Sequence, residues 1–141
     1  WYSDVYRYQG QQLYLYRSMR MAYLDSERLA PLMALELPEA AGPLAVWSSF
    51  DAAGNALEHA LGDGLQLPDH GLPLRGFEAS VMAAKLPLYR APGEASTRRY
   101  LVKGDRVELL DLDDPGHWLQ LRYRNRSRGP VMGWVKLAGL P

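Results

Sequence analysis

The chain has 141 residues with no cysteine, and its 16 basic side chains balance 16 acidic ones. The length allows one domain or two small ones, and 48% hydrophobic and 23% charged residues are typical of a folded protein. The lack of cysteine excludes disulfides, thiol catalysis and cysteine metal sites. No apolar run approaches the roughly 20 residues of a membrane span. No signal peptide is visible and the first residue is Trp1 rather than Met, so we expect a processed or trimmed piece of a longer protein.

The neutral net charge hides an asymmetry between the two halves of the chain. Residues 1–77 carry five basic and nine acidic side chains, whereas residues 78–141 carry eleven basic and seven acidic ones. Opposite charges can help the two halves to dock or to stay in solution. The alternative is that the basic half meets an acidic partner, such as an anionic wall polymer or an acidic protein surface.

Residues 1–61 are predicted to form antiparallel hairpins at the end of a larger β domain. Residues 1–24 are rich in Tyr, Leu and Arg, and the turn sequence Gln9-Gly10-Gln11 interrupts them. Residues 5–13 (VYRYQGQQL) resemble the hairpin that closes small β-rich secreted bacterial proteins of unassigned activity. This resemblance implies that strands preceding Trp1 are missing or lie in another chain.

One short helix and a second hairpin are expected next. Asp25 or Ser26 can cap the helix, and Pro31 keeps it short. The apolar runs 44–50 and 56–59 flank a Gly-containing turn, which predicts the hairpin.

Residues 62–77 are predicted to be a linker, since residues 62–76 hold four Gly and two Pro. Residues 78–141 then read as short strands separated by polar turns, one of them at Gly104-Asp105, which predicts a small barrel or sandwich. Residues two apart on a strand share a face, so alternation indicates which side chains are buried. We expect Val102, Val107 and Leu109 to point inward and Lys103, Arg106 and Glu108 to face water.

Four motifs in this second region resemble the bacterial SH3 (SH3b) pattern. They are LYRAPG at 88–93, LVKGDRV at 101–107, HWLQL at 117–121 and MGWV at 132–135. The resemblance covers roughly residues 79–141 and implies an SH3-like small barrel in an all-β protein. It also implies a periplasmic or cell-surface location in bacteria, because the family is common in envelope proteins. The chain departs from the pattern in a long arginine-rich insert at 122–128, where the family has a short turn.

Candidate catalytic and metal-binding residues each have a simpler structural explanation. The three histidines show neither the spacing of a zinc pair nor a cysteine partner. The acidic cluster Asp111, Asp113 and Asp114 lacks the distal Glu of a calcium loop. Ser48 and Ser49 lie outside any nucleophile-elbow sequence, and no pair of carboxylates is placed across a cleft. The sequence therefore predicts no enzyme, no cofactor and no metal site.

Aromatic side chains beside arginines make good recognition platforms, and the second region holds many of both. Trp118 and Trp134 are expected to fill the barrel core instead. The four arginines of the 122–128 insert alternate with other residues, so in an extended hairpin they share one face that can bind carboxylates or phosphates. A solvated hairpin tip is the alternative. The predicted binding residues are Tyr89, Arg90, Arg98, Arg99, Tyr100, Arg122, Arg124, Arg126 and Arg128.

The sequence favours a non-catalytic binding module of the bacterial cell envelope that recognises a peptide, a protein or a wall polymer such as peptidoglycan. One alternative is a periplasmic immunity protein or inhibitor that blocks a secreted toxin, and another is an accessory domain of an envelope enzyme. Nucleic acid is disfavoured as a partner, because modules that bind it are usually basic throughout, whereas this chain is neutral.

Overall fold

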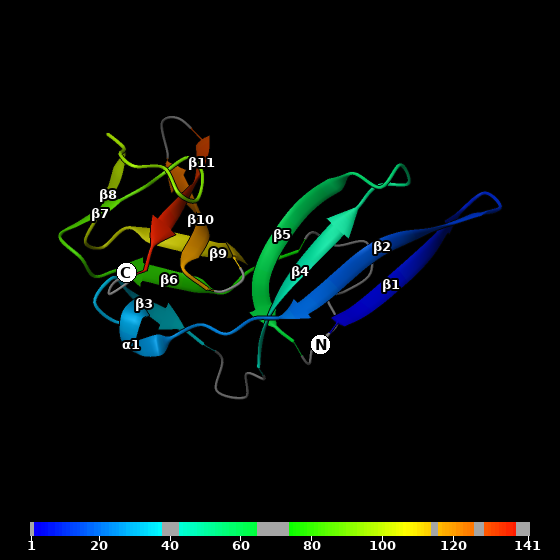
Figure 1. Ribbon diagram of the computed structural model, residues 1–141, viewed down its shortest axis with the longest axis horizontal. Helices are drawn as coiled ribbons and strands as arrows, with labels where there is room; N and C mark the ends of the chain where they lie inside the picture. The colour runs from blue at the N-terminus through cyan, green and yellow to red at the C-terminus, as the bar shows by residue number, and fades with distance from the viewer. Residues whose placement is uncertain (1, 38–42, 65–73, 114–115, 126–128, 138–141) are drawn as a thin grey trace.

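The protein is built almost entirely from antiparallel strands. The computed structural model describes residues 2–37, 43–64, 74–113, 116–125 and 129–137. Within these ranges the chain forms eleven strands and one four-residue helix, and all named strand pairs are antiparallel. The all-β prediction is confirmed. Figure 1 shows that the strands gather into two lobes, with the first hairpin at the tip farthest from the C-terminal lobe.

The first lobe is a four-stranded sheet, called here the N-terminal sheet. It contains β1 (Tyr2–Gln9), β2 (Gln12–Met21), β4 (Leu44–Phe50) and β5 (Ala56–Asp63) in the order β1-β2-β4-β5. Both predicted hairpins are confirmed, since β1 pairs with β2 and β4 pairs with β5. The first turn uses Gly10 with a positive φ, a conformation that glycine adopts at little cost.

The predicted short helix is confirmed as α1 (Ser26–Leu29), and Asp25 is its cap. The Asp25 carboxylate accepts hydrogen bonds from the backbone N–H groups at the start of the helix. The chain then forms β3 (Met33–Glu36), which pairs with β6 (Glu78–Val81) in the second lobe. Strand β3 precedes the linker predicted at residues 62–77 in the chain, yet it pairs with a strand that follows this linker.

The second lobe holds a five-stranded sheet, called here the C-terminal sheet, and a smaller two-stranded one. The C-terminal sheet runs in the order β11-β10-β9-β6-β3, with β9 (Arg106–Leu112), β10 (Trp118–Asn125) and β11 (Gly129–Lys136) consecutive in the chain. The two-stranded sheet pairs β7 (Lys85–Pro87) with β8 (Tyr100–Val102).

The larger hydrophobic core connects the two lobes. It contains Val46 and Leu61 from the N-terminal sheet together with Leu109, Leu119 and Leu121 from the C-terminal sheet. By strand alternation the opposite face of the N-terminal sheet packs a second, smaller core. That core consists of Met19, Ala45, Trp47, Ala60 and Leu74.

A short backbone bridge holds β5 beside β9. The N–H of Phe77 donates to the carbonyl of Leu61 across 2.9 Å, and the N–H of Leu109 donates to the carbonyl of Phe77 across 2.8 Å. Gly76 passes so close to β9 that a Cβ atom there would lie 1.7 Å from the carbonyl oxygen of Leu109. Residues 74–77 of the predicted linker are therefore packed structure, while residues 65–73 lie outside the described residues.

Two expectations about the burial of apolar side chains in the second region were wrong. Val102 is 44% exposed, because it lies on β8 before the Gly104-Asp105 turn, and its neighbour Leu101 is the buried residue. Val107 and Leu109 are buried as expected. Trp118 and Trp134 are only partly buried, because leucines and Val135 fill the core of the sheet. In the described residues no helix is long and apolar enough to span a membrane.

Candidate binding groove

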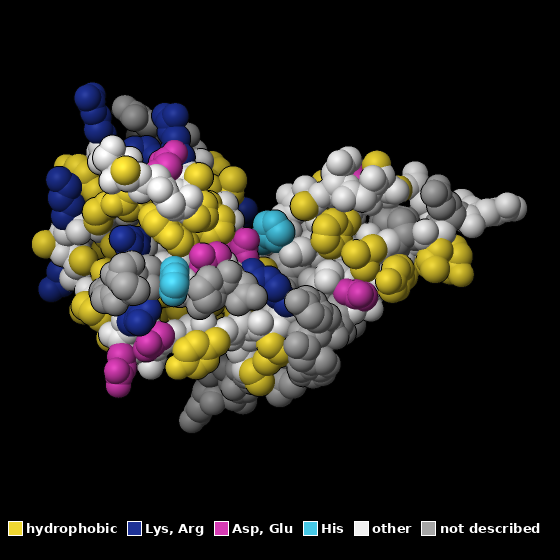
Figure 2. All heavy atoms as spheres, in the orientation of Figure 1, with side chains coloured by type: hydrophobic (Ala, Val, Ile, Leu, Met, Phe, Trp, Pro, Cys, Tyr) yellow, Lys and Arg dark blue, Asp and Glu magenta, His cyan; other side chains and the backbone are white. Residues whose placement is uncertain are grey.

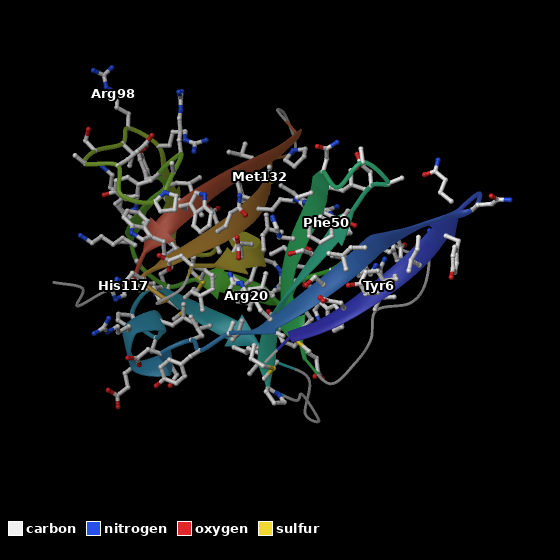
Figure 3. The ribbon with its side chains drawn as sticks, turned by 45° about the vertical axis from the view of Figure 1, so that its right-hand side comes forward. Tyr6, Arg20, Phe50, Arg98, His117 and Met132 are labelled. Carbon is white, nitrogen blue, oxygen red and sulfur yellow. The ribbon has the colours of Figure 1, made fainter. Side chains whose placement is uncertain are left out.

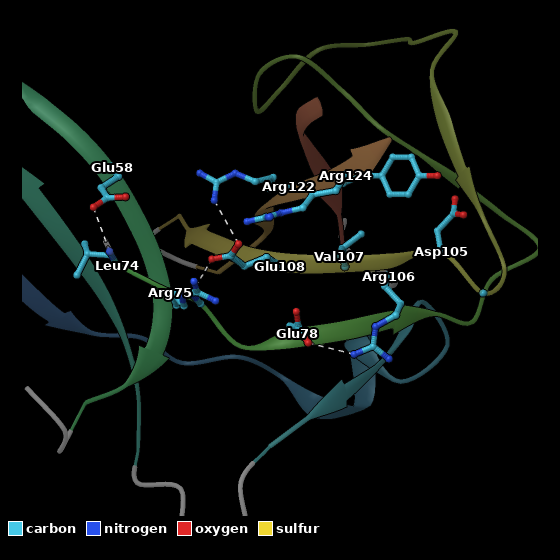
Figure 4. A pocket seen from close by; sticks show the side chains of 13 residues that line it. Glu58, Leu74, Arg75, Glu78, Asp105, Arg106, Val107, Glu108, Arg122 and Arg124 are labelled. Carbon is cyan, nitrogen blue, oxygen red and sulfur yellow. Dashed lines mark hydrogen bonds and ion pairs between the residues drawn. The ribbon is translucent and has the colours of Figure 1, made fainter. Parts of the chain in front are cut away.

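A groove of about 770 Å³ lies between the edge of β5 and the outer face of the C-terminal sheet. Figure 4 shows Glu58 on the β5 side and Glu78, Arg106, Glu108 and Arg122 on the other. Residues 74–76 form its floor, where the chain crosses from one lobe to the other. Charged side chains of both signs dominate the lining, so the groove suits a polar ligand better than an apolar one.

Cross-strand register explains why these charges meet. Glu36, Glu78, Glu108 and Arg122 lie opposite one another on four neighbouring strands and therefore share the outer face of the sheet. Like charges directly opposite each other are destabilising unless a counter-ion separates them. Arg106, on the same face, supplies that counter-ion for the first two carboxylates.

Arg106 binds two glutamates at once. Its Nη2 lies 2.8 Å from Glu36 Oε2 and 3.1 Å from Glu78 Oε2. Hydrogen bonds to Glu36, and then to Glu78, raise the pKa of the Arg106 guanidinium above its ordinary value. This ion pair is exposed to solvent, so it orders the groove wall more than it stabilises the fold.

Glu108 is the best-anchored charge in the groove. Its Oε1 lies 3.2 Å from Arg122 Nη1, and its Oε2 accepts a hydrogen bond of 2.9 Å from the backbone N–H of Gly76. The side chains of Glu108 and Arg122 are 14% and 24% exposed, so this pair is shielded from water. On the opposite wall, Glu58 accepts a hydrogen bond of 3.0 Å from the N–H of Leu74. Both carboxylates thus fix the position of the groove floor.

Two arginines of the lining differ from the rest. Arg75 on the floor and Arg124 on β10 are both exposed. In the described parts of the chain neither one makes a hydrogen bond or an ion pair, whereas Arg106 and Arg122 are paired with carboxylates. A free guanidinium presents a planar fork of donors that matches a carboxylate or a phosphate. Arg75 and Arg124 are therefore the described arginines of the lining that remain available to an anionic group.

The nine predicted binding residues divide between two places. Arg122 and Arg124 line the groove and share one face of β10, as alternation predicted. Arg126 and Arg128 lie outside the described residues. The other five belong to the two-stranded sheet or the segments beside it, and none of them lines the groove.

These five residues differ in how free they are to bind. Tyr89 is half-buried, its ring meeting the Trp118 ring edge-on at 5.3 Å. Arg99 Nη2 donates to the carbonyl of Met132 across 3.4 Å. Lys85 places its ammonium 4.5 Å from the centre of the Tyr100 ring, a cation–π contact. Arg90 and Arg98 are exposed, and Arg98 projects from the second lobe in Figure 3.

Sequence reasoning missed Arg75 and the carboxylates that position the groove. Alternation correctly predicted that Arg106 faces water. The same expectation for Glu108 was wrong, because its carboxylate is shielded by Arg122 and the backbone of Gly76. Alternation also did not show that both residues face a second lobe. Arg75 lies in the predicted linker, and the sequence contains no signal for its position. Its role depends on the contact between β5 and β9, which only the three-dimensional arrangement reveals.

A second polar cluster joins Ser48 and His59, and no sequence pattern had linked these two residues. Ser48 Oγ lies 2.7 Å from His59 Nδ1 on neighbouring strands. A serine nucleophile needs a base that a third group orients. In the described residues no carboxylate bonds to His59, and Asp4, on the same cross-strand row, bonds to Ser18 instead. The pair is therefore better described as part of a polar row than as a catalytic site.

The acidic cluster at the end of β9 and just after it has structural roles in its described part. Asp111 pairs with Arg20 across 2.8 Å. Asp113 accepts hydrogen bonds of 2.7 Å from the backbone N–H groups of His117 and Trp118. Asp114 lies outside the described residues. No three histidine, aspartate or glutamate side chains in the described ranges come together in a group that could hold a metal ion.

Comparison with known proteins does not indicate a function for this chain. Neither a protein-family model, nor a curated protein, nor a solved structure matches this chain.

Proposed function

We propose that the protein is a non-catalytic binding module and that the groove between its lobes receives an extended peptide segment carrying carboxylates. The observation that carries the proposal is the pair of exposed arginines, Arg75 and Arg124, in a groove whose other arginines are already paired. A carboxylate bound to either of them gains charge-assisted hydrogen bonds, which are about twice as strong as neutral ones.

The charge of the described side chains supports an anionic partner. Lysine and arginine gather on the C-terminal lobe in Figure 2, and this lobe forms the larger part of the groove lining. The lining of the groove carries as many carboxylates as arginines, so the attraction of an acidic segment toward the groove comes from the rest of this lobe. The ordered walls reduce the entropy lost on binding, because Arg106, Arg122 and Glu108 are held before the ligand arrives.

We further propose a location in the bacterial cell envelope, either periplasmic or at the cell surface. The support is the resemblance of four motifs in residues 79–141 to the SH3b pattern, a family common in envelope proteins. The partner is then a protein of the envelope or a peptide of the cell wall.

A matched pair of double variants tests the groove. An array of extended acidic peptides is screened with the whole chain, and the best binder is titrated by fluorescence anisotropy. Replacing Arg75→Ser together with Arg124→Ser should weaken binding about tenfold or more. Arg90→Ser with Arg98→Ser removes the same charge elsewhere on the second lobe and should change the affinity little. Binding should also weaken as salt is raised, because the contacts are exposed ion pairs.

Three outcomes argue against binding in the groove. They are that no acidic peptide binds, that both double variants weaken peptide binding equally, or that only the control variant weakens it. A pull-down from bacterial lysate then separates the remaining functions. Nanomolar capture of one secreted toxin supports an inhibitor. Co-sedimentation with purified wall sacculi supports a wall-binding module, and the absence of both supports an accessory domain.

A further inference from the structure

The outer end of the β1–β2 hairpin exposes a hydrophobic surface. Tyr6 pairs with Leu15 and Tyr8 pairs with Leu13, so strand alternation places all four side chains on one face, called here the tyrosine face. Tyr6 is 56% exposed, Tyr8 is 70% exposed and Leu13 is 52% exposed. Figure 3 shows Tyr6 on this arm, away from the C-terminal lobe. Contiguous exposed apolar surface of this kind usually marks a binding site.

The tyrosine face has no neighbouring strand among the described residues. Strand β2 pairs with β4 only from Arg17 to Met21, so the outer part of the hairpin is two strands wide. An isolated two-stranded hairpin is only marginally stable in water. On the reverse of this arm, Arg7 and Arg17 each lie about 5 Å from the centre of the Tyr16 ring. These contacts lie on the side of the hairpin opposite the tyrosine face and leave that face exposed.

A row of short hydrogen-bonding side chains borders the tyrosine face. Asp4, Ser18, Ser48 and His59 lie opposite one another on the four strands of the N-terminal sheet, and Asp4 shares a face with Tyr6 two residues on. Ser18 Oγ donates to Asp4 Oδ1 across 2.7 Å, and Ser48 Oγ lies 2.7 Å from His59 Nδ1. The row offers donors and acceptors, and Asp4 is its single carboxylate. It therefore favours a ligand rich in hydroxyl groups and without a strong charge of its own.

We propose that the tyrosine face and its polar row bind the sugar rings of a neutral polysaccharide. A sugar ring has an apolar C–H face that packs on an aromatic ring and a rim of hydroxyls that needs hydrogen-bond partners, and these two surfaces match the two parts of this site. Tyr6 and Tyr8 stand about 7 Å apart along the strand, so they can contact successive regions of one extended chain.

The charges of the neighbourhood distinguish this site from the groove. Arg7 points to the reverse face, where it contacts Tyr16, so no described arginine joins Tyr6 and Tyr8 on the tyrosine face. An acidic ligand therefore finds no counter-charge there. This site is separate from the groove, which is lined by other residues, and the two sites can be tested independently.

Isothermal titration of the whole chain with chitohexaose, cellohexaose and maltohexaose tests the site. We expect at least one of these neutral oligosaccharides to bind, and Tyr6→Ala with Tyr8→Ala to weaken that binding about fivefold or more. Tyr23→Ala is the matched control, since Tyr23 is 79% exposed and lies outside the tyrosine face. It should leave the affinity unchanged. Circular dichroism shows whether the double variant keeps its strands, and Leu13→Ala provides a second, smaller change on the same face.

The proposal is overturned if none of the three sugars binds at about 1 mM, or if binding survives both the double variant and Leu13→Ala. It is also overturned if sedimentation shows a dimer that the double variant dissociates, because the face is then an interface between copies of this chain. Arg75→Ser with Arg124→Ser should leave sugar binding intact, so failure of the groove and failure of the tyrosine face are distinguishable.

Discussion

The guanidinium of Arg20 on β2 donates to the carboxylate of Asp111 on β9 across 2.8 Å, which joins the two sheets by an ion pair. The same guanidinium donates to the carbonyl of Leu112. Both charged side chains are largely shielded, at 31% and 20% exposed. Together with the bridge through Phe77, this contact sets how the lobes face each other, and the groove between them depends on that arrangement.

Arg20→Ala should lower the free energy of unfolding by about 1.5–3 kcal/mol, the usual value for hydrogen bonds to charged groups. The Asp111 carboxylate would retain the N–H of Leu112 but lose its counter-ion. Arg28→Ala is the control, because Arg28 makes a more exposed pair with Asp25 at 3.5 Å and should cost about 0.5 kcal/mol or less. Urea unfolding curves measure both. Equal losses in the two variants would show that the pair between the lobes is energetically unimportant.

The two described arginines of the 122–128 insert should differ in their effect on stability. Arg122→Ser leaves Glu108, a shielded carboxylate, without its guanidinium and should cost about 1.5–3 kcal/mol of unfolding free energy. Arg124→Ser removes an exposed side chain and should change stability by about 0.5 kcal/mol or less. Thermal unfolding of each variant checks this. A stable Arg122→Ser protein would mean that Gly76 alone holds Glu108 in place.

Much of the fold follows from local patterns in the sequence. Gly-containing turns between apolar runs predicted both hairpins of the N-terminal sheet, because a tight turn needs a residue that adopts positive φ, as Gly10 and Gly54 do. Asp25 predicted the helix start by its capping chemistry. These features depend on neighbours in the chain, so one sequence is enough to find them.

The groove could not be predicted in the same way. Arg75 and Glu58 meet β9 and β10 through contacts between segments far apart in the sequence, and alternation says only which face a residue occupies. The pairing of β3 with β6 could not be predicted either, because nothing in residues 33–36 indicates which strand they pair with. Trp118 is only partly buried, because its ring packs edge-on against the ring of Tyr89, a partner that strand alternation does not predict. Tertiary context decides such cases.

Gly76→Ala should be the most damaging small substitution in the described chain segments that join the lobes. The new Cβ would lie 1.7 Å from the backbone carbonyl oxygen of Leu109, and backbone atoms cannot move aside as a side chain can. We expect a loss of about 3 kcal/mol or more, or failure to fold. Gly54→Ala is the control, because its φ of 88° is strained for alanine but the space is open. It should cost about 1–2 kcal/mol. Similar unfolding midpoints for the two variants would contradict the close packing of β5 and β9.

The turn between β4 and β5 should respond to pH through Asp51. Hydrogen bonds to its carboxylate from the backbone N–H of Asn55, and then from the Asn55 side chain, lower the pKa of Asp51 below the ordinary value of 3.8. Because the folded pKa is the lower one, this carboxylate stabilises the fold above pH 3.8 and its contribution is lost as pH falls through the folded pKa. The effect is small, since the hydrogen bonds of this turn are exposed to water, which weakens them.

An NMR titration of the Asp51 side-chain carboxyl carbon in the whole chain measures this shift. We expect a midpoint below 3.8 in the native protein and a midpoint closer to 3.8 in the Asn55→Ala variant, which keeps the backbone donor but loses the side-chain amide. Asp51→Ala should lower the melting temperature at neutral pH and have less effect below the folded pKa, where the native carboxyl is itself protonated. If the midpoint lies at 3.8 or above, the turn is open in solution and Asp51 does not hold the hairpin.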